Sequence, residues 1–317
     1  MKALVFDKRL KLVLDYPAPA LKENEALIRV KYAGICATDL EIVKGYMGFK
    51  GVPGHEFSGV VEACEIPGLV NRRVTGEINL GCGVCAYCRG GLRAHCPERS
   101  VLGILGKDGA FAEYLTLPVD NLHVLPDEIS DEEGAFVEPL ASAFEILSQI
   151  EIGRGTRVAV LGDGRLGILT AEVLSLSGCP LTAIGRHEEK LAILKARGIE
   201  TAVGAEGLGS EFDIVVECTG RNEGLSTALK LVKPRGTVVL KTTVADRGGA
   251  DLNRAVIDEV TIIGSRCGPF KPAIAALKER AVDVGPLVSR VFALEEGIEA
   301  FQYASQSGVL KALIKVE

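Results

Sequence analysis

The chain has 317 residues, of which 47% are hydrophobic, and carries a formal net charge of −6. This length suits two domains, and the acidic balance gives no electrostatic footprint for nucleic acid or for an anionic membrane. The first residues alternate apolar and charged side chains, unlike the core of a signal peptide, and no run of about 18 apolar residues could span a bilayer. We therefore expect a cytoplasmic enzyme or binding protein with neither nucleic acid nor membrane among its partners.

The first 125 residues have the pattern of a β-rich domain. Short runs rich in β-branched, aliphatic and aromatic side chains alternate with Gly and Pro turns. This pattern predicts strands over residues 3–6, 26–32, 58–62 and 110–116.

Three residues of metal-binding type are widely spaced within the first 140 residues. Cys36 lies in GICATDL, His55 opens GHEFSGVV, and Glu138 lies in VEPLA. Taken singly, each has an ordinary structural explanation: a small buried hydrophobe, a hydrogen-bonded core histidine and an acid at a helix N-terminus. Only their combination with the motifs that follow gives them weight.

Four cysteines lie close together in the segment GCGVCAYCRGGLRAHC. Cys82, Cys85, Cys88 and Cys96 have the spacing C-x2-C-x2-C-x7-C, which brings four thiolates into one loop. Four soft ligands at tetrahedral reach suit Zn²⁺, and because no position is left for water, such a site is structural. An iron–sulfur cluster is the alternative, since three cysteines at this spacing, with Pro97 after the fourth, also fit a ferredoxin-like loop.

A dinucleotide-binding pattern begins at residue 157. An aliphatic strand over residues 157–161 is followed by the turn GDGRLG (162–167), a helix over 168–177 and a second strand over 181–184. This order of strand, GxGxxG turn, helix and strand is the context that a dinucleotide fingerprint requires.

Each glycine of the turn has an expected role. Gly162 permits the tight turn, Gly164 lets backbone N–H groups approach a pyrophosphate, and Gly167 lets the helix lie close to the strand. The N-terminus of the helix then directs its partial positive charge toward the phosphates.

The end of the second strand bears on the choice of cofactor. An NAD site usually places Asp or Glu there to hold the ribose hydroxyls, whereas this chain has Gly185, Arg186 and His187, with no acid before Glu188. A guanidinium can bind a 2′-phosphate with two hydrogen bonds, so we expect NADP(H) to be preferred over NAD(H). In the alternative interpretation, Arg186 is an ordinary surface residue and Glu188 or Glu189 binds the ribose.

Further apolar strands over residues 212–217, 237–240 and 260–264 alternate with helices, which predicts a parallel sheet covered on both faces. The carboxyl ends of such strands face the cofactor at the point where the strand order reverses. The residues expected to contact the cofactor are Gly162, Gly164, Arg165, Leu166, Gly167, Gly185, Arg186, His187, Cys218, Thr219, Gly220, Lys241 and Thr242.

These motifs, together with ECTG and the closing GVLKALIKVE, stand in the order seen in one enzyme family. The chain resembles the zinc-containing medium-chain dehydrogenase/reductase family, which includes alcohol, sorbitol and threonine dehydrogenases. The resemblance implies an α/β protein in which a Rossmann doubly wound parallel sheet is joined to a GroES-like β-barrel catalytic domain. The catalytic domain would comprise residues 1–140, completed by residues 267–317, and the Rossmann domain residues 141–266.

The resemblance also implies two zinc ions per chain. Cys36, His55 and Glu138 would bind the catalytic zinc, and Glu56 could enter or leave its coordination sphere. Thr38 would pass on the substrate proton. The four-cysteine loop would hold the structural zinc.

The expected function is a zinc-dependent, NADP-preferring alcohol or polyol dehydrogenase. It would interconvert a secondary alcohol with its ketone, or an alcohol with its aldehyde, by hydride transfer. Two alternatives remain: a zinc-free quinone or enone reductase, and a non-catalytic or redox-sensing NADP(H)- and zinc-binding protein on the same fold. The resemblance also implies a homodimer or homotetramer, paired through the edge strand near residues 260–264.

Overall fold

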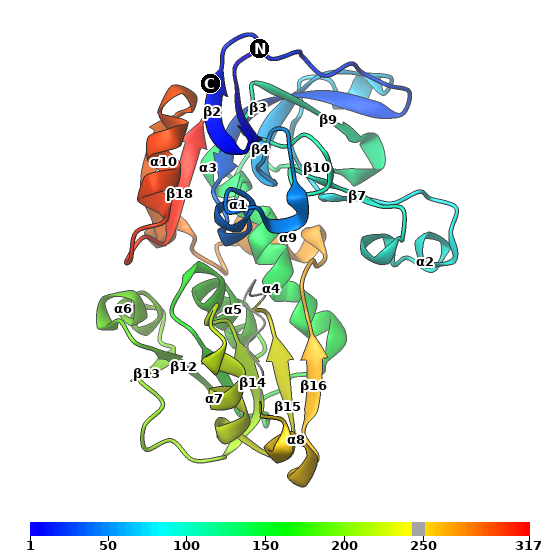
Figure 1. The fold of residues 1–317 in the computed structure, drawn as a ribbon. Helices are drawn as coiled ribbons and strands as arrows, with labels where there is room; N and C mark the ends of the chain where they lie inside the picture. The colour runs from blue at the N-terminus through cyan, green and yellow to red at the C-terminus, as the bar shows by residue number, and fades with distance from the viewer. Residues whose placement is uncertain (243–250) are drawn as a thin grey trace. The chain divides into compact units, whose positions relative to one another are not determined.

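The computed structural model describes residues 1–242 and 251–317. The chain forms two compact units, coloured along the chain in Figure 1. Unit 1 comprises Met1–Glu138 and Val284–Glu317, and unit 2 is the continuous segment Pro139–Asp283.

Residues 267–283 group with unit 2, whereas the family resemblance implies that they belong to the catalytic domain. The backbone at Gly268 packs against helix α4 (Val137–Gln149). A Cβ added to Gly268 would lie 2.1 Å from the carbonyl oxygen of Ala141 in that helix. Farther along, Nη2 of Arg197 donates a hydrogen bond to the carbonyl oxygen of Ala281 at 2.7 Å. These contacts account for the grouping.

The main sheet of unit 1 has seven strands in the order β10-β5-β4-β3-β18-β17, with β9 also pairing with β3. The pairs are antiparallel, except that β17 and β18 are parallel. Apolar side chains alternate along β3, where Ala26, Ile28 and Val30 are fully buried, as expected of a strand with one face on a core. The strands are β3 (Glu25–Gly34), β4 (Glu56–Cys64), β5 (Arg73–Gly76), β9 (Tyr114–Pro118), β10 (Leu122–Val124), β17 (Val288–Ala293) and β18 (Lys311–Lys315).

The rest of unit 1 consists of a hairpin, a small sheet and short helices. The hairpin pairs β1 with β2, and the small sheet has the order β6-β7-β8. The elements are β1 (Ala3–Asp7), β2 (Arg9–Val13), β6 (Asn79–Leu80), β7 (Ser100–Leu102), β8 (Gly106–Lys107), α1 (Ala37–Ile42), α2 (Ala86–Arg89), α3 (Asp131–Gly134) and α10 (Gly297–Ala304).

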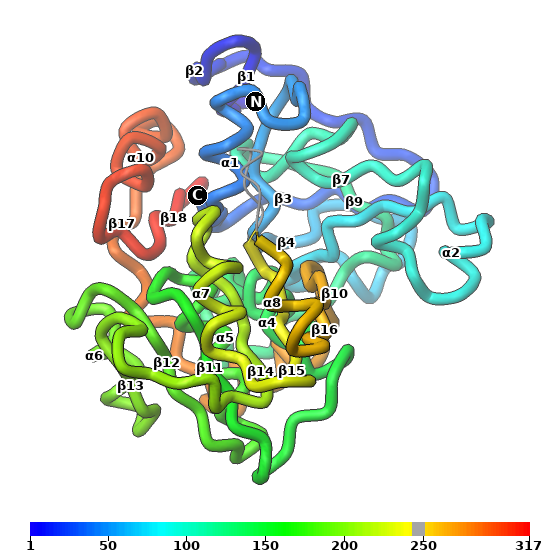
Figure 2. Tube along the Cα trace, turned by 60° about the horizontal axis from the view of Figure 1, so that its bottom comes forward, coloured from blue at the N-terminus to red at the C-terminus, as the bar shows by residue number. Residues whose placement is uncertain are grey.

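Unit 2 is built on a parallel sheet of six strands in the order β13-β12-β11-β14-β15-β16. Figure 2 shows the same succession, with β13 at one edge and β16 at the other. The strands are β11 (Val158–Leu161), β12 (Leu181–Gly185), β13 (Glu200–Val203), β14 (Phe212–Glu217), β15 (Val232–Leu240) and β16 (Thr261–Gly264). The helices are α4 (Val137–Gln149), which begins in unit 1, α5 (Arg165–Ser175), α6 (Glu188–Ala196), α7 (Glu223–Leu231), α8 (Asn253–Ile257) and α9 (Phe270–Lys278).

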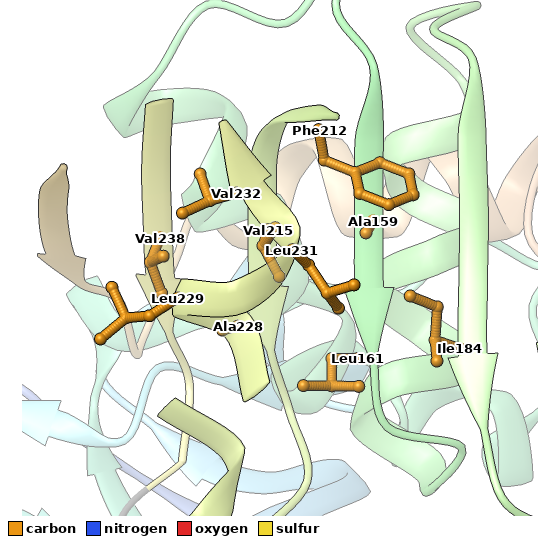
Figure 3. Close-up of a cluster of buried hydrophobic side chains, with 10 residues drawn as sticks. All are labelled: Ala159, Leu161, Ile184, Phe212, Val215, Ala228, Leu229, Leu231, Val232 and Val238. Atoms are coloured by element: carbon orange, nitrogen blue, oxygen red, sulfur yellow. The ribbon is translucent and has the colours of Figure 1, made fainter. Parts of the chain in front are cut away.

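The core of unit 2 explains why its central strands have continuous apolar sequences. Every residue of β11 is buried, as expected of a parallel strand covered on both faces. One cluster, drawn in Figure 3, joins β11, β12, β14 and β15 to helix α7. It consists of Ala159, Leu161, Ile184, Phe212, Val215, Ala228, Leu229, Leu231, Val232 and Val238.

Several element bounds differ from the sequence prediction. The strand predicted over residues 110–116 begins only at Tyr114 and runs to Pro118, and β3 and β4 are longer than the predicted 26–32 and 58–62. Helix α5 begins at Arg165, inside the glycine turn, because Gly164 already serves as its N-cap. Strand β15 begins at Val232, which pairs with Phe212 before the register shifts. None of the helices within residues 1–242 and 251–317 has the length and apolarity needed to cross a membrane.

Candidate active site

Strand pairing in unit 1 brings three predicted metal-binding residues together. Cys36 is the N-cap of α1, just after β3. Glu56 begins β4, and His55 directly precedes it. The antiparallel register pairs Gly34 with Glu56, so the end of β3 lies beside the start of β4. One potential ligand atom from each of Cys36, His55 and Glu56 lies within 4.8 Å of the others.

Asp39, which is fully buried, holds this arrangement in place. Its Oδ2 accepts a hydrogen bond from the backbone N–H of Cys36 at 2.7 Å, and its Oδ1 accepts one from Gly54 at 3.2 Å. Oδ1 also lies 3.4 Å from Nδ1 of His55. A carboxylate beside a metal-binding imidazole commonly fixes the orientation of the ring.

The surroundings of His55 shift its protonation equilibrium in opposite directions. Burial lowers the pKa of the imidazole, whereas the Asp39 carboxylate and the Cys36 thiol beside it raise that pKa. The net result is a pKa well above the ordinary value.

Glu56 is paired with Lys311 of strand β18. Both side chains are 1% exposed, and the ammonium group contacts Oε2 of the carboxylate. The Lys311 Nζ atom also lies 3.4 Å from the carbonyl oxygen of Ile35. Oε1 of Glu56 is buried and has no hydrogen-bond partner in the described part of the chain. One carboxylate oxygen is therefore neutralised, and the other is available to a cation.

The other residues predicted for this site are placed less closely. The Oγ1 atom of Thr38 lies 3.8 Å from Sγ of Cys36. Glu138, at the start of α4, is 9% exposed and does not belong to the group formed by Cys36, His55 and Glu56. Its role as a zinc ligand stays a prediction.

The four predicted cysteines converge in a second group of potential ligands. The Sγ atoms of Cys82, Cys85, Cys88 and Cys96 lie within 4.8 Å of one another, and those of Cys85 and Cys96 are 3.8 Å apart. Backbone N–H groups donate to two of the sulfur atoms: Cys82 to Cys96 and Cys88 to Cys85, each at 3.4 Å. Such donors stabilise thiolates, which are the form that binds metal.

The glycine turn of unit 2 has the geometry of a dinucleotide-binding turn. Gly162 has φ +127°, which disfavours other residues, and a Cβ on Gly167 would lie 2.0 Å from the carbonyl oxygen of Gly162. By contrast, a Cβ on Gly164 would meet nothing within 4 Å. The turn is therefore closed toward the helix and open in front of Gly164.

The predicted cofactor-binding residues lie in the turn, which follows β11, and at the carboxyl ends of three further strands, β12, β14 and β15. Arg165 and Leu166 begin α5, and Gly185 ends β12, with Arg186 and His187 directly after it. Residues 218–220 follow β14, and residues 241 and 242 follow β15. The Oγ1 atom of Thr242 accepts a hydrogen bond from the backbone N–H of Gly220 at 2.9 Å.

Lys241 makes contacts that the sequence does not predict. Its Nζ donates to the carbonyl oxygens of Ser142 at 2.6 Å and Arg266 at 3.2 Å, and to Oγ of Ser265 at 3.3 Å. Lys241 therefore ties α4 to the segment that follows β16.

Arg186 and Asp163 meet at the end of β12. The Arg186 side chain is exposed, and its backbone N–H donates to Oδ2 of Asp163 at 2.5 Å. Glu188 and Glu189, the alternative ribose acids, are exposed in the first turn of α6.

Comparison with known proteins places these features in one family. The family model described as "Alcohol dehydrogenase GroES-like domain" matches residues 22–127, and that described as "Zinc-binding dehydrogenase" matches residues 166–281. The alcohol dehydrogenase of Thermus sp. ATN1 is 30% identical, and its structure superposes with a TM-score of 0.90 over 100% of both chains. The chain belongs to the zinc-containing medium-chain dehydrogenase/reductase family.

Other members of the family match over almost the same length. A sorbitol dehydrogenase of Halalkalibacterium halodurans is 28% identical, with 95% of this chain and 94% of the relative covered. An L-threonine 3-dehydrogenase of Legionella pneumophila is 29% identical, with 93% and 94% covered. A zinc-binding dehydrogenase of Sinorhizobium meliloti, solved with NADP, has 26% identity and a TM-score of 0.89 over 99% of both chains. Membership confirms the predicted combination of a GroES-like domain with a Rossmann sheet.

Three residues that shape the sites of this family member were missed in the sequence. Asp39 lies inside the GICATDL motif, three residues after Cys36, which is the spacing of a capping box. Lys311 directly precedes the apolar run ALI in strand β18. A lysine at a buried strand position is unusual unless an acidic side chain pairs with it. Asp163 is the second residue of the glycine turn, where only the glycines drew attention.

Proposed function

We propose that this protein is a zinc-dependent dehydrogenase that interconverts a secondary alcohol or polyol with its carbonyl compound and prefers NADP(H). The observation that carries the proposal is the convergence of Cys36, His55 and Glu56 on one point in unit 1 of a chain whose unit 2 has an open dinucleotide turn. Relatives named sorbitol dehydrogenase, L-idonate 5-dehydrogenase and L-threonine 3-dehydrogenase support this substrate class, because each named compound carries a secondary hydroxyl.

The donor atoms fit zinc. Zinc binds sulfur at about 2.3 Å and imidazole nitrogen at about 2.0–2.1 Å, so its ligand atoms lie within the mutual distance of 4.8 Å found here. A thiolate, an imidazole and a carboxylate also match its preference for mixed ligands. The buried Oε1 of Glu56, which has no partner among the described residues, is a natural oxygen ligand. Glu138 is proposed as the further carboxylate.

Zinc bound there would polarise a substrate oxygen and lower the pKa of a bound hydroxyl toward about 7. The chain supplies the rest of the chemistry. Asp39 keeps the imidazole of His55 oriented, and the hydroxyl of Thr38, 3.8 Å from Cys36 Sγ, accepts the substrate proton and passes it on. Lys311 neutralises Glu56 whether or not that carboxylate also binds the metal, because its ammonium group contacts Oε2 and leaves Oε1 available. A zinc ion bound by two anionic ligands, Cys36 and Glu138, then keeps a neutral formal charge at the site.

NADP(H) preference rests on Arg186. Its exposed guanidinium stands at the end of β12, where a 2′-phosphate on the adenosine ribose would be held, and it can make two hydrogen bonds to that phosphate. The NADP-bound structure of the Sinorhizobium meliloti relative supports the same cofactor.

The loop of Cys82, Cys85, Cys88 and Cys96 is proposed to hold a second, structural zinc. With four sulfur ligands no position is left for substrate, so its contribution is to stability.

The proposed oligomer is a homodimer or homotetramer paired through β16. This strand ends the parallel sheet, so one of its edges has no strand partner in the described sheet. Val256, Ile257 and Ile262, on or just before this strand, are 77%, 78% and 37% exposed. A second copy of the chain would cover both the edge and these side chains.

The deciding experiment offers alcohols, polyols and amino alcohols with NAD and NADP separately and measures the metal content of the same preparation. We expect turnover with secondary alcohols, higher kcat/KM with NADP, and two zinc ions per chain. Nucleotide binding without turnover on any substrate would favour the non-catalytic alternative. Reduction of quinones or enones by a metal-free protein would favour the zinc-free reductase.

A further inference from the structure

Asp163 occupies the place of a side chain at the end of strand β12. A Cβ built on Gly185 would lie 2.5 Å from Cβ of Asp163 and 2.6 Å from its Oδ2. Real side chains do not approach so closely, so Gly185 and Asp163 fit together only as a pair. The acid that dinucleotide folds usually carry at this strand end is therefore supplied by the glycine turn itself.

One oxygen of this carboxylate is fully used within unit 2. Oδ2 accepts hydrogen bonds from the backbone N–H groups of Arg186 at 2.5 Å and His187 at 2.7 Å, and it lies 3.0 Å from Nδ1 of His187. Burial alone would raise the pKa of Asp163, but these donors outweigh burial and bring it below its ordinary value. The side chain is thus anionic and fixed in orientation at neutral pH.

The other carboxylate oxygen, Oδ1, accepts no such hydrogen bond from the described part of the chain. Oδ1 of Asp163 has no hydrogen-bond partner among residues 1–242 and 251–317, and it is not one of the buried unpaired atoms. An anionic acceptor that reaches solvent therefore lies next to the backbone of Arg186, a residue whose side chain is exposed. Hydroxyl groups are the natural donors for such an oxygen.

We propose that Asp163 binds the adenosine ribose hydroxyls and opposes Arg186 in the choice of cofactor. This inference rests on the proposed nucleotide site. Asp163 accepts a hydrogen bond from the 2′-hydroxyl of NAD(H) and repels the 2′-phosphate of NADP(H), whereas Arg186 attracts that phosphate. The protein therefore binds both cofactors, and its preference for NADP(H) is smaller than Arg186 alone would give.

The variant Asp163→Asn keeps the shape of the side chain, replaces the outward oxygen with an amide NH₂ group and removes the negative charge. The amide oxygen can still accept the two backbone hydrogen bonds, and the amide NH₂ group takes the place of Oδ1 as a donor. We expect the dissociation constant of NADH to rise by about tenfold or more, because a charge-assisted hydrogen bond is lost. We expect the dissociation constant of NADPH to fall, because a negative charge beside its phosphate is removed.

Binding is measured by titrating the full-length protein and following the fluorescence of NADH and NADPH. Arg186→Gln is the matched control, and we expect it to weaken NADPH binding while leaving NADH binding nearly unchanged. Equal weakening of both cofactors by Asp163→Asn, or unchanged NADH binding, would overturn the inference.

A second variant guards against a purely structural effect. In Asp163→Gly/Gly185→Asp the carboxylate returns to the strand end, and the side chain that blocked that position is gone. We expect it to bind NADH more tightly than Asp163→Gly does, whereas Gly185→Asp alone should disrupt the turn. NADH affinity no better in the double variant than in Asp163→Gly would count against the inference.

These titrations separate the inference from the proposed function, because they do not depend on turnover. A wild-type protein that binds neither nucleotide would overturn both. A protein that binds both nucleotides, and whose Asp163→Asn variant shows the expected change, supports the inference even if no alcohol is oxidised.

Discussion

The ammonium group of Lys311 contacts the carboxylate of Glu56 in the interior of unit 1, and each side chain is 1% exposed. The two residues lie in strands β18 and β4, and they are 255 positions apart in the sequence. A Cβ on Gly34 would lie 2.4 Å from Oε2 of Glu56, so the backbone of β3 confines the carboxylate from a third side.

Removing the charge of Lys311 should destabilise the fold strongly. Lys311→Met keeps most of the volume but leaves a buried carboxylate without its counter-ion, and we expect the free energy of unfolding to fall by about 3–5 kcal/mol. Denaturation of the full-length protein in urea measures this change. The double variant Glu56→Gln/Lys311→Met should recover much of the loss, because neither charge is then buried. A single variant as stable as the wild type would contradict this account of the pair.

Cys96→Ser should remove one zinc ion per chain without abolishing the other site. Cys96 is fully buried, and its sulfur lies 3.8 Å from that of Cys85. The serine hydroxyl is a poorer ligand for zinc than a thiolate, so we expect metal analysis to give one zinc in place of two, together with a lower melting temperature. Cys64→Ser, outside the loop, serves as the control. Iron in the wild-type protein would favour the iron–sulfur alternative.

Glu138 and Asp39 should differ in how much activity depends on them. If Glu138 binds the catalytic zinc, Glu138→Ala should lower kcat by more than about 100-fold while NADPH affinity stays nearly unchanged. Asp39→Asn preserves the shape of a residue that positions His55 and the backbone of Cys36 and Gly54, and it should lower kcat by about 10–100-fold. Steady-state kinetics and nucleotide titration check both variants. An active Glu138→Ala enzyme would refute its assignment as a ligand.

Two glycines of the turn should respond differently to the same substitution. In Gly167→Ala the new methyl group would lie 2.0 Å from the carbonyl oxygen of Gly162, and we expect a loss of about 1–3 kcal/mol in stability. Gly164→Ala meets no atom within 4 Å and should leave the melting temperature nearly unchanged, but it should weaken nucleotide binding where the pyrophosphate approaches. Thermal unfolding and nucleotide titration distinguish the two effects. Equal melting temperatures would show that the turn tolerates the extra carbon.

A charge on the edge strand β16 should separate the subunits. Ile262→Lys places an ammonium group on the proposed interface, and we expect the molar mass in light scattering to fall by half or more. Val203→Lys is the control, because Val203 is 62% exposed on β13, at the opposite edge of the sheet. Dissociation by the control variant, or none by Ile262→Lys, would place the interface elsewhere.

Local features were the ones that could be predicted from the sequence. The turn of residues 162–167 is recognisable because local geometry requires its glycines. Gly162 has a positive φ angle, and Gly167 lies too close to the carbonyl oxygen of Gly162 to carry a side chain. The four-cysteine loop spans only fifteen residues, so its convergence also needed no knowledge of the fold. Cys36 and His55 required the family resemblance, because a pairing of β3 with β4 brings them together.

What the sequence could not give depends on contacts between distant elements. The carboxylate of Asp163 can lie at the end of β12 only because Gly185, in the neighbouring strand, has no side chain there. The pairing of Lys311 with Glu56 becomes apparent only once β18 is placed beside β3. Neither contact leaves a periodic pattern or a fixed spacing in the sequence.

Strand β18 is synthesised long after the strand it completes. Residues 32–34 of β3 leave the ribosome early, and their partners in β18 follow only after the whole of unit 2. Unit 2 is one continuous segment that can fold while the chain is still growing, whereas the interior around Glu56 stays open until its counter-ion arrives. During translation, the half that is proposed to bind the cofactor can therefore fold before the half that is proposed to carry the catalytic metal.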